Sequence, residues 1–566
     1  MYEELRTTWN DLTAPGQMFE VKTVEVRGAP MRSYAMAPPS LREVWLGTAA
    51  FADREYLVYG DERCTYAQAH EKVASIANWL SQQGVGPGDR VAIAMRNYPE
   101  WMLAYWAVTS MGAVVVGMNA WWVPAEMKYA LDDSSPKVMI CDKERLAQFE
   151  QIRGDFPDLS VAVVRIDAAA EGLVTDWAEV LASAPEMPQP TIDPDDDACI
   201  FYTSGTTGKP KGAQLTHRGC VNNLMNVGFS SVVQAAALAK ASGRAPAAPD
   251  PNEIQSALVA TPLFHVTANN CVAHAISSVG GKLVHMYKWD ATEALRLIEQ
   301  ERVTAFSAVP MMSRELLNHP DFAKYDTSSV KTMGGGGAAL QPDLTAKLDK
   351  TMENAAPSAG YGMTETCGII SGLAGKFLVD RAASVGRAMP TFEAKCVDEQ
   401  GNTLPTGKVG ELWVRGACVV KGYLNREDAT AESITDGWLH TGDVAYMDED
   451  EFIFLVDRAK DMVLRGGENV YCAEVENALF EHDAVAECVV FAVPDDRLEE
   501  EVAAAIYPKD GVVVSVDELR AHCKGLLASY KVPRYMWLVS EPLPRNANGK
   551  FVKAEVRDAL DLADAQ

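Results

Sequence analysis

The sequence predicts an α/β protein: a large N-terminal domain of doubly wound sheets with a small β-rich subdomain, followed by an α+β C-terminal domain. Three observations lead to this fold class. The chain has 566 residues, too many for one hydrophobic core, so two or more domains are expected. Up to about residue 380, short apolar runs alternate with helical patterns, which is typical of sheets covered by helices. Beyond that point, short strand patterns separated by glycine and proline turns take over.

In the N-terminal half, apolar patterns and caps place each element. Segment 67–83 is predicted to be a helix, with Thr65 as its N-cap and Gly84 at its end. The other predicted helices are 40–51, 101–111, 216–228 and 291–301. The predicted buried strands are 90–95, 114–116, 138–141, 161–166, 198–201, 257–260, 282–286 and 305–310. Segment 235–251 is rich in Ala, Pro and Gly, so a solvent-exposed loop is predicted there.

The C-terminal half is predicted to contain two smaller units. Strand patterns at 384–386, 410–416 and 452–456 predict a β-rich subdomain at about 384–456. After it, helices at 473–481 and 516–527 and strands at 486–493 and 501–507 predict a compact α+β domain.

Charge and cysteine content limit the partners and the compartment. The formal net charge is −27, and such a field opposes nucleic acid and anionic membranes. The eleven cysteines include no CxxC pair and no Cys/His cluster, which argues for a reducing compartment and against a structural metal. The first residues carry acids without an apolar core, and the last three match no common targeting signal. A cytoplasmic protein is expected.

One uncharged segment, 101–125, is long enough to cross a bilayer. Gly112 and Asn119 interrupt it, and its residue pattern changes midway from one typical of a helix to one typical of a strand. A buried helix followed by a short parallel strand is therefore predicted, and no transmembrane span.

The segment 202–212 reads Tyr-Thr-Ser-Gly-Thr-Thr-Gly-Lys-Pro-Lys-Gly and directly follows a predicted strand. Its three glycines allow backbone N–H groups to converge on an anion, and its hydroxyls and lysines add donors and positive charge. The glycine spacing differs from that of a P-loop. The alternative is a flexible linker, but linkers rarely follow a buried strand so abruptly. The sequence predicts a polyphosphate-binding loop.

Two further segments combine glycines with groups that could bind a nucleotide. Tyr361 stands between Gly360 and Gly362, which exposes an aromatic face for a base, and Thr364 and Glu365 follow at phosphate range. A turn and a capped helix are the structural alternative. Upstream, four successive glycines at 334–337 are costly to order, so we expect something to approach their backbone closely.

Two polar residues near glycines complete the pattern. Asp443 follows Gly442 and could accept two hydroxyl hydrogen bonds, although an Asx turn would look the same in isolation. Lys550 lies on a Gly/Asn turn, where a lysine is normally only solvent-exposed.

Taken in order, these segments resemble the signatures of the adenylate-forming superfamily, in its acyl-CoA synthetase branch. The superfamily includes acyl-CoA synthetases, aryl-CoA ligases, luciferases and peptide-synthetase adenylation domains. The resemblance spans about residues 40–555, with modest departures at 117–119 and at Cys472. It implies ATP, Mg²⁺ and CoA as cofactor and co-substrates, and a mobile C-terminal domain. The implied boundaries are 1–459 and 460–566, with Lys460 as the hinge.

The resemblance assigns roles to individual residues. The implied catalytic residues are Lys550, Thr207, Lys211 and Glu365, and Glu365 also holds the metal. The implied nucleotide-binding residues are Thr203, Ser204, Gly205, Thr206, Gly208, Lys209, Gly337, Ala338, Ala339, Gly360, Tyr361, Gly362, Thr364, Asp443 and Arg458. The acid pocket is expected to include His265, Gly335, Gly336 and Met363, and the thiol tunnel Gly466 and Gly467. A lone histidine is usually structural, so His265 is an open case.

The function implied is an ATP-dependent carboxylic acid–CoA ligase that forms an acyl-adenylate and then a thioester. A medium- or long-chain fatty acid is the expected substrate, with an aryl or polycyclic acid as the alternative. An adenylation enzyme loading a carrier protein, a luciferase-like oxidase and a catalytically inactive binding protein are further alternatives. The expected partners are small molecules, and a homodimer is the one protein assembly considered.

Overall fold

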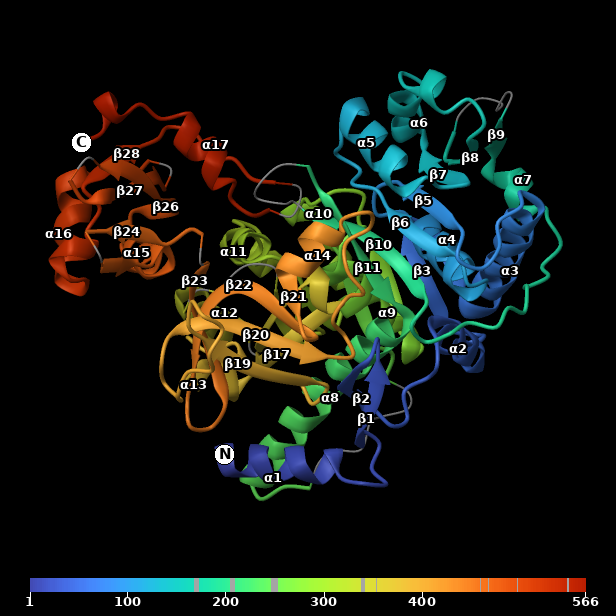
Figure 1. Cartoon of the computed structure of the whole chain (residues 1–566), viewed down its shortest axis with the longest axis horizontal. Helices are drawn as coiled ribbons and strands as arrows, with labels where there is room; N and C mark the ends of the chain where they lie inside the picture. The colour runs from blue at the N-terminus through green and yellow to red at the C-terminus, as the bar shows by residue number, and fades with distance from the viewer. Residues whose placement is uncertain are drawn as a thin grey trace.

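The computed structural model describes residues 1–566 except 167–172, 204–208, 246–252, 337–339, 341, 353, 459, 467, 496, 510 and 547–548. Its strands form two large mixed sheets, an antiparallel sheet, a C-terminal sheet and a short hairpin. In Figure 1 the C-terminal sheet with its helices lies at one end of the molecule, and β5, β7 and β8 lie at the other. The predicted fold class is confirmed.

The first large sheet has seven strands in the order β11-β10-β6-β5-β7-β8-β9. All neighbours are parallel except the antiparallel pair β10–β11. The strands are β5 (Arg90–Ala94), β6 (Val114–Gly117), β7 (Val138–Asp142), β8 (Ser160–Val164), β9 (Val174–Asp176), β10 (Asp197–Thr203) and β11 (Lys211–Thr216). The helices in this part of the chain are α3 (Tyr66–Gln82), α4 (Pro99–Ser110), α5 (Pro124–Ser134), α6 (Lys143–Phe149) and α7 (Trp177–Leu181). Thr65 caps α3 in a capping box with Gln68, as predicted.

The second large sheet has eight strands in the order β17-β16-β15-β14-β12-β13-β3-β4. The strands are β3 (Glu55–Tyr59), β4 (Glu62–Thr65), β12 (Ser256–Val259), β13 (Lys282–His285), β14 (Ala305–Ser307), β15 (Thr332–Gly335), β16 (Ala356–Met363) and β17 (Gly368–Ala374). Its helices are α8 (His217–Ala241), α9 (His274–Ser278), α10 (Ala291–Glu301), α11 (Pro310–Asn318), α12 (Pro342–Thr351) and α13 (Lys376–Asp380). A π-helix at Thr267–Ala273, which the sequence analysis missed, precedes α9.

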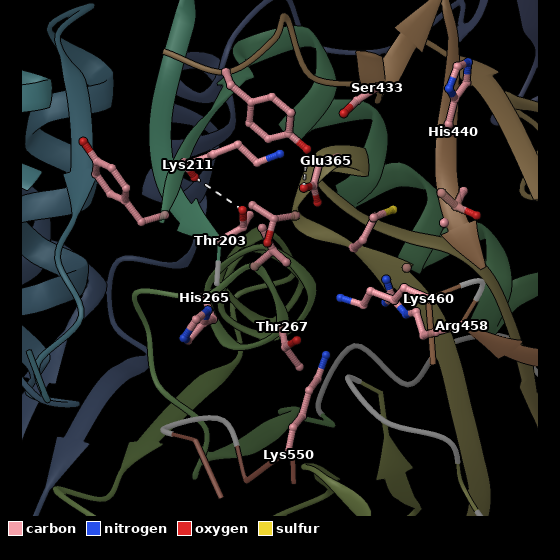
Figure 2. A pocket seen from close by; sticks show the side chains of 18 of the residues that line it. Thr203, Lys211, His265, Thr267, Glu365, Ser433, His440, Arg458, Lys460 and Lys550 are labelled. Atoms are coloured by element: carbon pink, nitrogen blue, oxygen red, sulfur yellow. Dashed lines mark hydrogen bonds between the residues drawn. The ribbon is translucent and has the colours of Figure 1, made fainter. Parts of the chain in front are cut away.

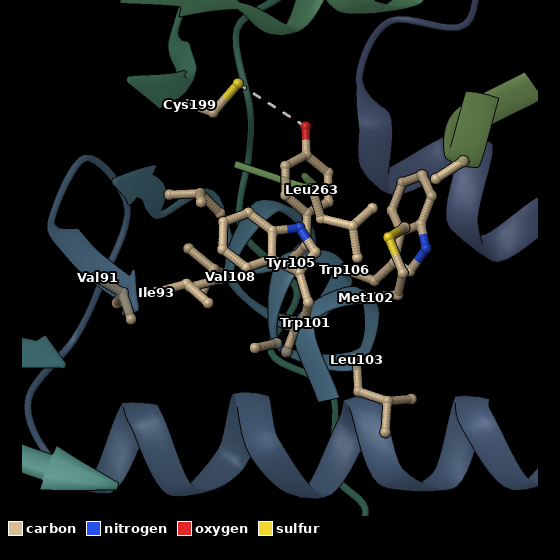
Figure 3. Packing of buried hydrophobic residues seen from close by; sticks show 14 of the residues in the cluster. Val91, Ile93, Trp101, Met102, Leu103, Tyr105, Trp106, Val108, Cys199 and Leu263 are labelled. Carbon is tan, nitrogen blue, oxygen red and sulfur yellow. Dashed lines mark hydrogen bonds between the residues drawn. The ribbon is translucent and has the colours of Figure 1, made fainter. Parts of the chain in front are cut away.

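The largest hydrophobic core joins these two sheets, and α4 lies inside it. Trp101 and Trp106 are fully buried, and their indole N–H groups donate to Asn269 and Tyr56. Figure 3 shows these rings among Met102, Val108 and Leu263. The uncharged segment is therefore a buried helix followed by β6, as predicted. No helix within the described residues is long and apolar enough to cross a membrane.

The third sheet is antiparallel and contains β18 (Gly386–Arg387), β19 (Phe392–Val397), β20 (Gly410–Gly416), β21 (Ile434–Thr435), β22 (Trp438–Met447) and β23 (Phe452–Arg458). It matches the predicted β-rich region. Gly442 lies within β22 with φ of 69°, so the strand is locally distorted directly before Asp443. The helix α14 (Glu427–Ser433) lies between β20 and β21.

The C-terminal sheet consists of β24 (Val463–Arg465), β25 (Glu468–Val470), β26 (Val485–Asp495), β27 (Glu499–Pro508) and β28 (Tyr535–Leu538). It packs with α15 (Cys472–Phe480) and α16 (Val516–Leu526) around one hydrophobic core, and with α17 (Lys553–Asp558) around a second, smaller one. The predicted helices and strands of this region are confirmed to within one or two residues at most ends.

In the N-terminal half, no element was predicted before residue 40, and one prediction was wrong. The start of the chain forms α1 (Tyr2–Thr13) and the hairpin β1 (Val21–Val26) with β2 (Ala29–Tyr34). The predicted loop at 235–251 is helical up to Ala241, because an alanine-rich stretch favours a helix and Gln234 and Ala237 are buried. Residues 246–252 lie outside the described part of the chain.

The helix α8 is covered on its outer side by α1. The Trp9 ring meets the Phe229 ring edge-on with 4.7 Å between centroids, and Lys240 forms an ion pair with Asp11 at 3.1 Å. The strand β17 also contacts α8. The helix α8 is therefore held by elements from two distant parts of the sequence, α1 and β17.

Candidate active site

A cavity of about 490 Å³ lies where β10, β11, β16, β22 and β23 converge with the turn that carries Lys550. We call it the polar cavity. Figure 2 shows the side chains of Thr203, Lys211, Glu365, Arg458 and Lys550 around it. Segments that are separated by hundreds of residues in the sequence thus share one site.

The predicted phosphate loop connects β10 to β11. Its central residues Ser204, Gly205, Thr206, Thr207 and Gly208 lie outside the described part of the chain. At its ends, the Thr203 hydroxyl donates to the carbonyl of Lys211 at 3.4 Å, and both residues line the polar cavity. The ammonium of Lys209 instead lies 4.8 Å from the ring centroid of Tyr129, and Lys209 does not line the cavity.

Glu365 is buried at the wall of the polar cavity. One carboxylate oxygen accepts a hydrogen bond from the Tyr423 hydroxyl at 2.8 Å. Its other carboxylate oxygen makes no hydrogen bond within the described residues. The ammonium of Lys211 lies 4.3 Å from the ring centroid of Tyr423. Burial and the neighbouring Glu365 raise the pKa of Tyr423, so its hydroxyl stays protonated and donates.

Sequence reasoning missed Tyr423. It lies between β20 and α14, and neither its spacing nor its neighbours pointed to Glu365. The one available signal was a glycine followed by a tyrosine, Gly422-Tyr423, some residues after a predicted strand. That signal does not show that Tyr423 lines the polar cavity, which only the folded structure reveals.

Asp443 is held by the neighbouring strands. The register places Asp443 of β22 opposite Arg458 of β23, and the Arg458 Nε lies 2.6 Å from Asp443 Oδ1. The Tyr361 hydroxyl donates to Asp443 Oδ2 at 2.6 Å. Burial raises the pKa of Asp443, and Arg458, Tyr361 and Lys550 oppose that rise. The two predicted nucleotide-binding residues on β16 and β22 are therefore in direct contact.

Lys550 points into the polar cavity from the C-terminal domain, beside Thr267 and facing Arg458 and Lys460 (Figure 2). Although its side chain is exposed to the cavity, the protein around it displaces enough water to lower the pKa of Lys550. Arg458 and Lys460 lower the pKa further, whereas Asp443 and Glu365 raise it. Lys460, expected only as a hinge, also lines this cavity.

His265 also lines the polar cavity, across from Arg458 and Lys460 (Figure 2). Its Nε2 is buried and has no hydrogen-bond partner among the described residues. Burial lowers the pKa of His265 to about 3, and the positive Lys550 contributes. The imidazole is therefore neutral near pH 7 and keeps one ring nitrogen available to a bound molecule.

A second cavity of about 470 Å³ continues from the first, and the two share Val266, Thr267 and Gly362. We call it the small-residue cavity, because glycine, alanine and serine dominate its lining. Gly335 and Gly336, which were expected in the acid pocket, line this cavity, and Gly360 lines it as well. Met363 and His265 line the polar cavity instead.

Of the remaining predicted site residues, Thr364 lines the polar cavity, and Tyr361 and Asp443 line neither cavity. Gly337, Ala338, Ala339 and Gly467 lie outside the described residues. Gly466 is in the turn between β24 and β25 and lines neither cavity. The thiol tunnel stays a prediction.

Comparison with known proteins explains this constellation. Residues 46–424 match the model of the AMP-binding enzyme family, and residues 474–550 match that of the AMP-binding enzyme C-terminal domain. A feruloyl-CoA synthase of Amycolatopsis sp is 36% identical over 530 residues, covering 93% of this chain and 99% of that protein. A 2-succinylbenzoate–CoA ligase of Bacillus cereus is 32% identical over 524 residues, covering 91% and 98%.

Solved structures agree with these sequence matches. The crystal structure of the anthranilate CoA ligase AuaEII in complex with anthranoyl-AMP has a TM-score of 0.81 at 25% identity, covering 92% of this chain and 98% of that one. The o-succinylbenzoate CoA synthetase MenE of Bacillus subtilis, in complex with its acyl-adenylate, has a TM-score of 0.77 at 28% identity, covering 93% and 99%. The chain therefore belongs to the AMP-binding enzyme family, and it is an acid–thiol ligase of the acyl-CoA synthetase type.

Proposed function

We propose that this enzyme joins a ring-bearing carboxylic acid to CoA through an acyl-adenylate. The observation that carries the proposal is the meeting of the two cavities at Val266, Thr267 and Gly362. The polar cavity offers charged groups for ATP, and the small-residue cavity offers room for a carbon skeleton. The carboxylate of the acid would lie at the junction.

The choice of acid is supported by the relatives. Their names specify feruloyl, 2-succinylbenzoate and, in a Rhodococcus jostii ligase that is 32% identical, a dioxo-octahydro-indenyl propanoate. These are ring-bearing acids, and none of these names supports the medium- or long-chain fatty acid expected from the sequence. We therefore favour the aryl or polycyclic alternative.

In the first half-reaction, a carboxylate oxygen attacks the α-phosphorus of ATP, and pyrophosphate leaves with the electrons of the broken P–O bond. Negative charge grows on the phosphates, so preorganised cations lower the barrier. In this proposal Lys211 and Lys550 supply that charge, and Asp443 accepts hydrogen bonds from the ribose. The free oxygen of Glu365 suits Mg²⁺, which takes one or two carboxylates plus phosphate oxygens and would neutralise the same charge.

In the second half-reaction, the thiol of CoA attacks the acyl carbon, the carbon–oxygen bond breaks, and AMP leaves. Lys550 fills part of the polar cavity from the C-terminal domain. We propose that rotation at Lys460 withdraws it and admits the thiol.

The function is tested by pyrophosphate release and AMP formation with ATP, Mg²⁺ and a panel of aryl, polycyclic and straight-chain acids, with and without CoA. We expect AMP and an acyl-CoA from at least one ring-bearing acid, with lower kcat/KM for the straight-chain acids. A preference for straight-chain acids would overturn the choice of substrate. Adenylate formation without a CoA thioester would favour a carrier protein as the acceptor.

Replacing Tyr423 with phenylalanine is expected to raise the Mg²⁺ concentration needed for half-maximal AMP formation by about tenfold. Among the described residues, the change removes the one hydrogen bond to the Glu365 carboxylate, worth on the order of 1.5–3 kcal/mol for a charged acceptor. Glu365→Gln should have a larger effect of the same kind. Tyr446→Phe is the matched control, because Tyr446 stacks on Phe454 away from the cavity. An unchanged Mg²⁺ dependence in Tyr423→Phe would remove Tyr423 from the site.

The low pKa of Lys550 predicts the alkaline side of the pH profile. The ammonium loses its proton as pH rises through a pKa that is below the ordinary lysine value of about 10.4, and its positive charge is lost with it. The value of kcat/KM for ATP, which reports the free enzyme, should therefore fall on an alkaline limb below that value. Lys550→Arg should move the limb upward, because arginine keeps its charge. If the alkaline limb lies at the same pH in the unmodified enzyme and in Lys550→Arg, a group other than Lys550 causes it.

A further inference from the structure

The sheet wall of the small-residue cavity is built from small side chains on four adjacent strands. The register aligns Ser307, Gly334, Ser358 and Ala374 across β14, β15, β16 and β17. Two residues along β16, Gly360 pairs with Gly372. Because the side chains on these successive strands are small, the small-residue cavity remains open between the sheet and α8.

Four polar residues cross this cavity as a belt, which we call the polar belt: Ser230, Gln234, Ser307 and Ser358. Gln234 is buried on α8, and its side-chain oxygen accepts from the backbone N–H of Ala374 at 2.7 Å. Its amide nitrogen donates to the carbonyl and to the hydroxyl oxygen of Ser230, at 3.0 Å each. Gln234 thereby orients Ser230 so that the hydroxyl proton of Ser230 is left to donate.

The two serines on the sheet have free hydroxyls. Neither Ser307 nor Ser358 makes a side-chain hydrogen bond to any residue that the structure describes, and both line the cavity. The inner end of the cavity is apolar at Val266 and Ile369. At its outer end Ala356 and Leu238 converge near Gly375, and Thr332 lies opposite Ala356 on the neighbouring strand. The free hydroxyls of Ser307 and Ser358 therefore lie at one level of the sheet wall, on either side of Gly334.

The belt lies at a defined depth from the reacting carboxylate. Gly362 is at the junction with the polar cavity, and Ser230 lies beside Gly372, at the level of Gly360. At a rise of about 3.3 Å per strand residue, that level is roughly 7 Å from the junction and Ser358 is roughly 13 Å from it. An alkyl chain passing through this zone would remove water from the hydroxyls without replacing their hydrogen bonds.

We propose that the acid carries a hydroxyl or keto oxygen on its skeleton, which the polar belt binds at this depth. This inference rests on the proposed function, since it concerns the acid of that reaction. Sites that hydrogen-bond a substrate oxygen discriminate strongly against analogues that lack it, because their polar groups are left unpaired.

The first test compares acids of one skeleton: para-hydroxycinnamic with cinnamic acid, and a keto-bearing bicyclic propanoic acid with its deoxy analogue. We expect the oxygenated member of at least one pair to have a kcat/KM for pyrophosphate release about tenfold or more higher. Equal values in both pairs, with AMP formed, would overturn the polar belt and leave the proposed function standing. No AMP from any ring-bearing acid would refute the proposed function, and this inference with it.

The second test uses Ser358→Ala and the double variant Ser307→Ala/Ser358→Ala. We expect the ratio of kcat/KM between oxygenated and deoxy acids to fall toward one, through loss on the oxygenated acid alone. Thr332→Val is the matched control, since Thr332 lines the cavity two strand residues beyond the belt. Unchanged ratios in the serine variants, or an equal loss on both acids, would overturn the proposal. Binding of each acid in the presence of AMP, followed by calorimetry, should change in parallel with the ratio.

Discussion

Replacing Lys550 with alanine is expected to slow acyl-adenylate formation by about 100- to 1,000-fold. Removal of one preorganised charge from an enclosed site typically costs this much in kcat. Lys550 projects from the C-terminal turn into the polar cavity. Its ammonium interacts there with the charges of Arg458, Lys460, Asp443 and Glu365. Pyrophosphate release in single-turnover experiments measures the effect.

The control for this prediction separates the two half-reactions. Thioester formation from supplied acyl-adenylate and CoA should stay within about threefold of the unmodified enzyme, since that step breaks no bond to phosphorus. Lys524→Ala, an exposed lysine on α16, should change neither step. If Lys550→Ala impairs both half-reactions equally, the lysine supports the fold or the domain arrangement rather than adenylation.

Replacing Lys460 with proline is expected to preserve adenylation and to reduce acyl-CoA formation by about 100-fold. Proline fixes φ near −65°, so a backbone rotation centred on this residue becomes inaccessible. Lys460 follows β23 directly before the C-terminal sheet, where few residues can absorb such a rotation. AMP formation without CoA and thioester formation with CoA are measured separately.

Because the Lys460 side chain also lines the polar cavity, Lys460→Ala is the necessary companion. It removes the same ammonium but leaves the backbone free, so it should retain thioester formation. Blocked thioester formation in both variants would mean that the side chain matters and that the rotation is centred elsewhere. Normal CoA turnover in Lys460→Pro would remove the hinge from this position.

Much of the fold could be predicted because local pattern and final environment agree. The helix that begins after Thr65 has its capping box, and the strand at 114–117 is buried on both faces as its valines require. The helical extension to Ala241 was missed because composition suggested a loop, whereas packing of Gln234 and Ala237 determined the outcome. The hairpin of β1 and β2 lacked a sequence signal that outweighed its polar residues.

The polar cavity was predicted better than the small-residue cavity, for a physical reason. Charged and glycine-rich motifs can be recognised from a few neighbouring residues. Glu365, Asp443 and Lys550 could therefore be named before their positions in the fold were known. The polar belt depends on strand register and on the helix opposite, and a serine such as Ser358 carries no sign of either. Tyr423 belongs to the same class, since its role exists only through the carboxylate it meets.

The packing of α1 on α8 has a consequence for how this enzyme is handled. The matched AMP-binding family region begins at residue 46, so α1 lies outside it, yet α1 supports the helix that carries Ser230 and Gln234. An affinity tag fused to Met1, or a trimmed N-terminus, would disturb acid selectivity before it disturbed ATP use. A different N-terminal segment packed on α8 is thus a route to different acid selectivity in related enzymes, without any change in the residues that bind ATP.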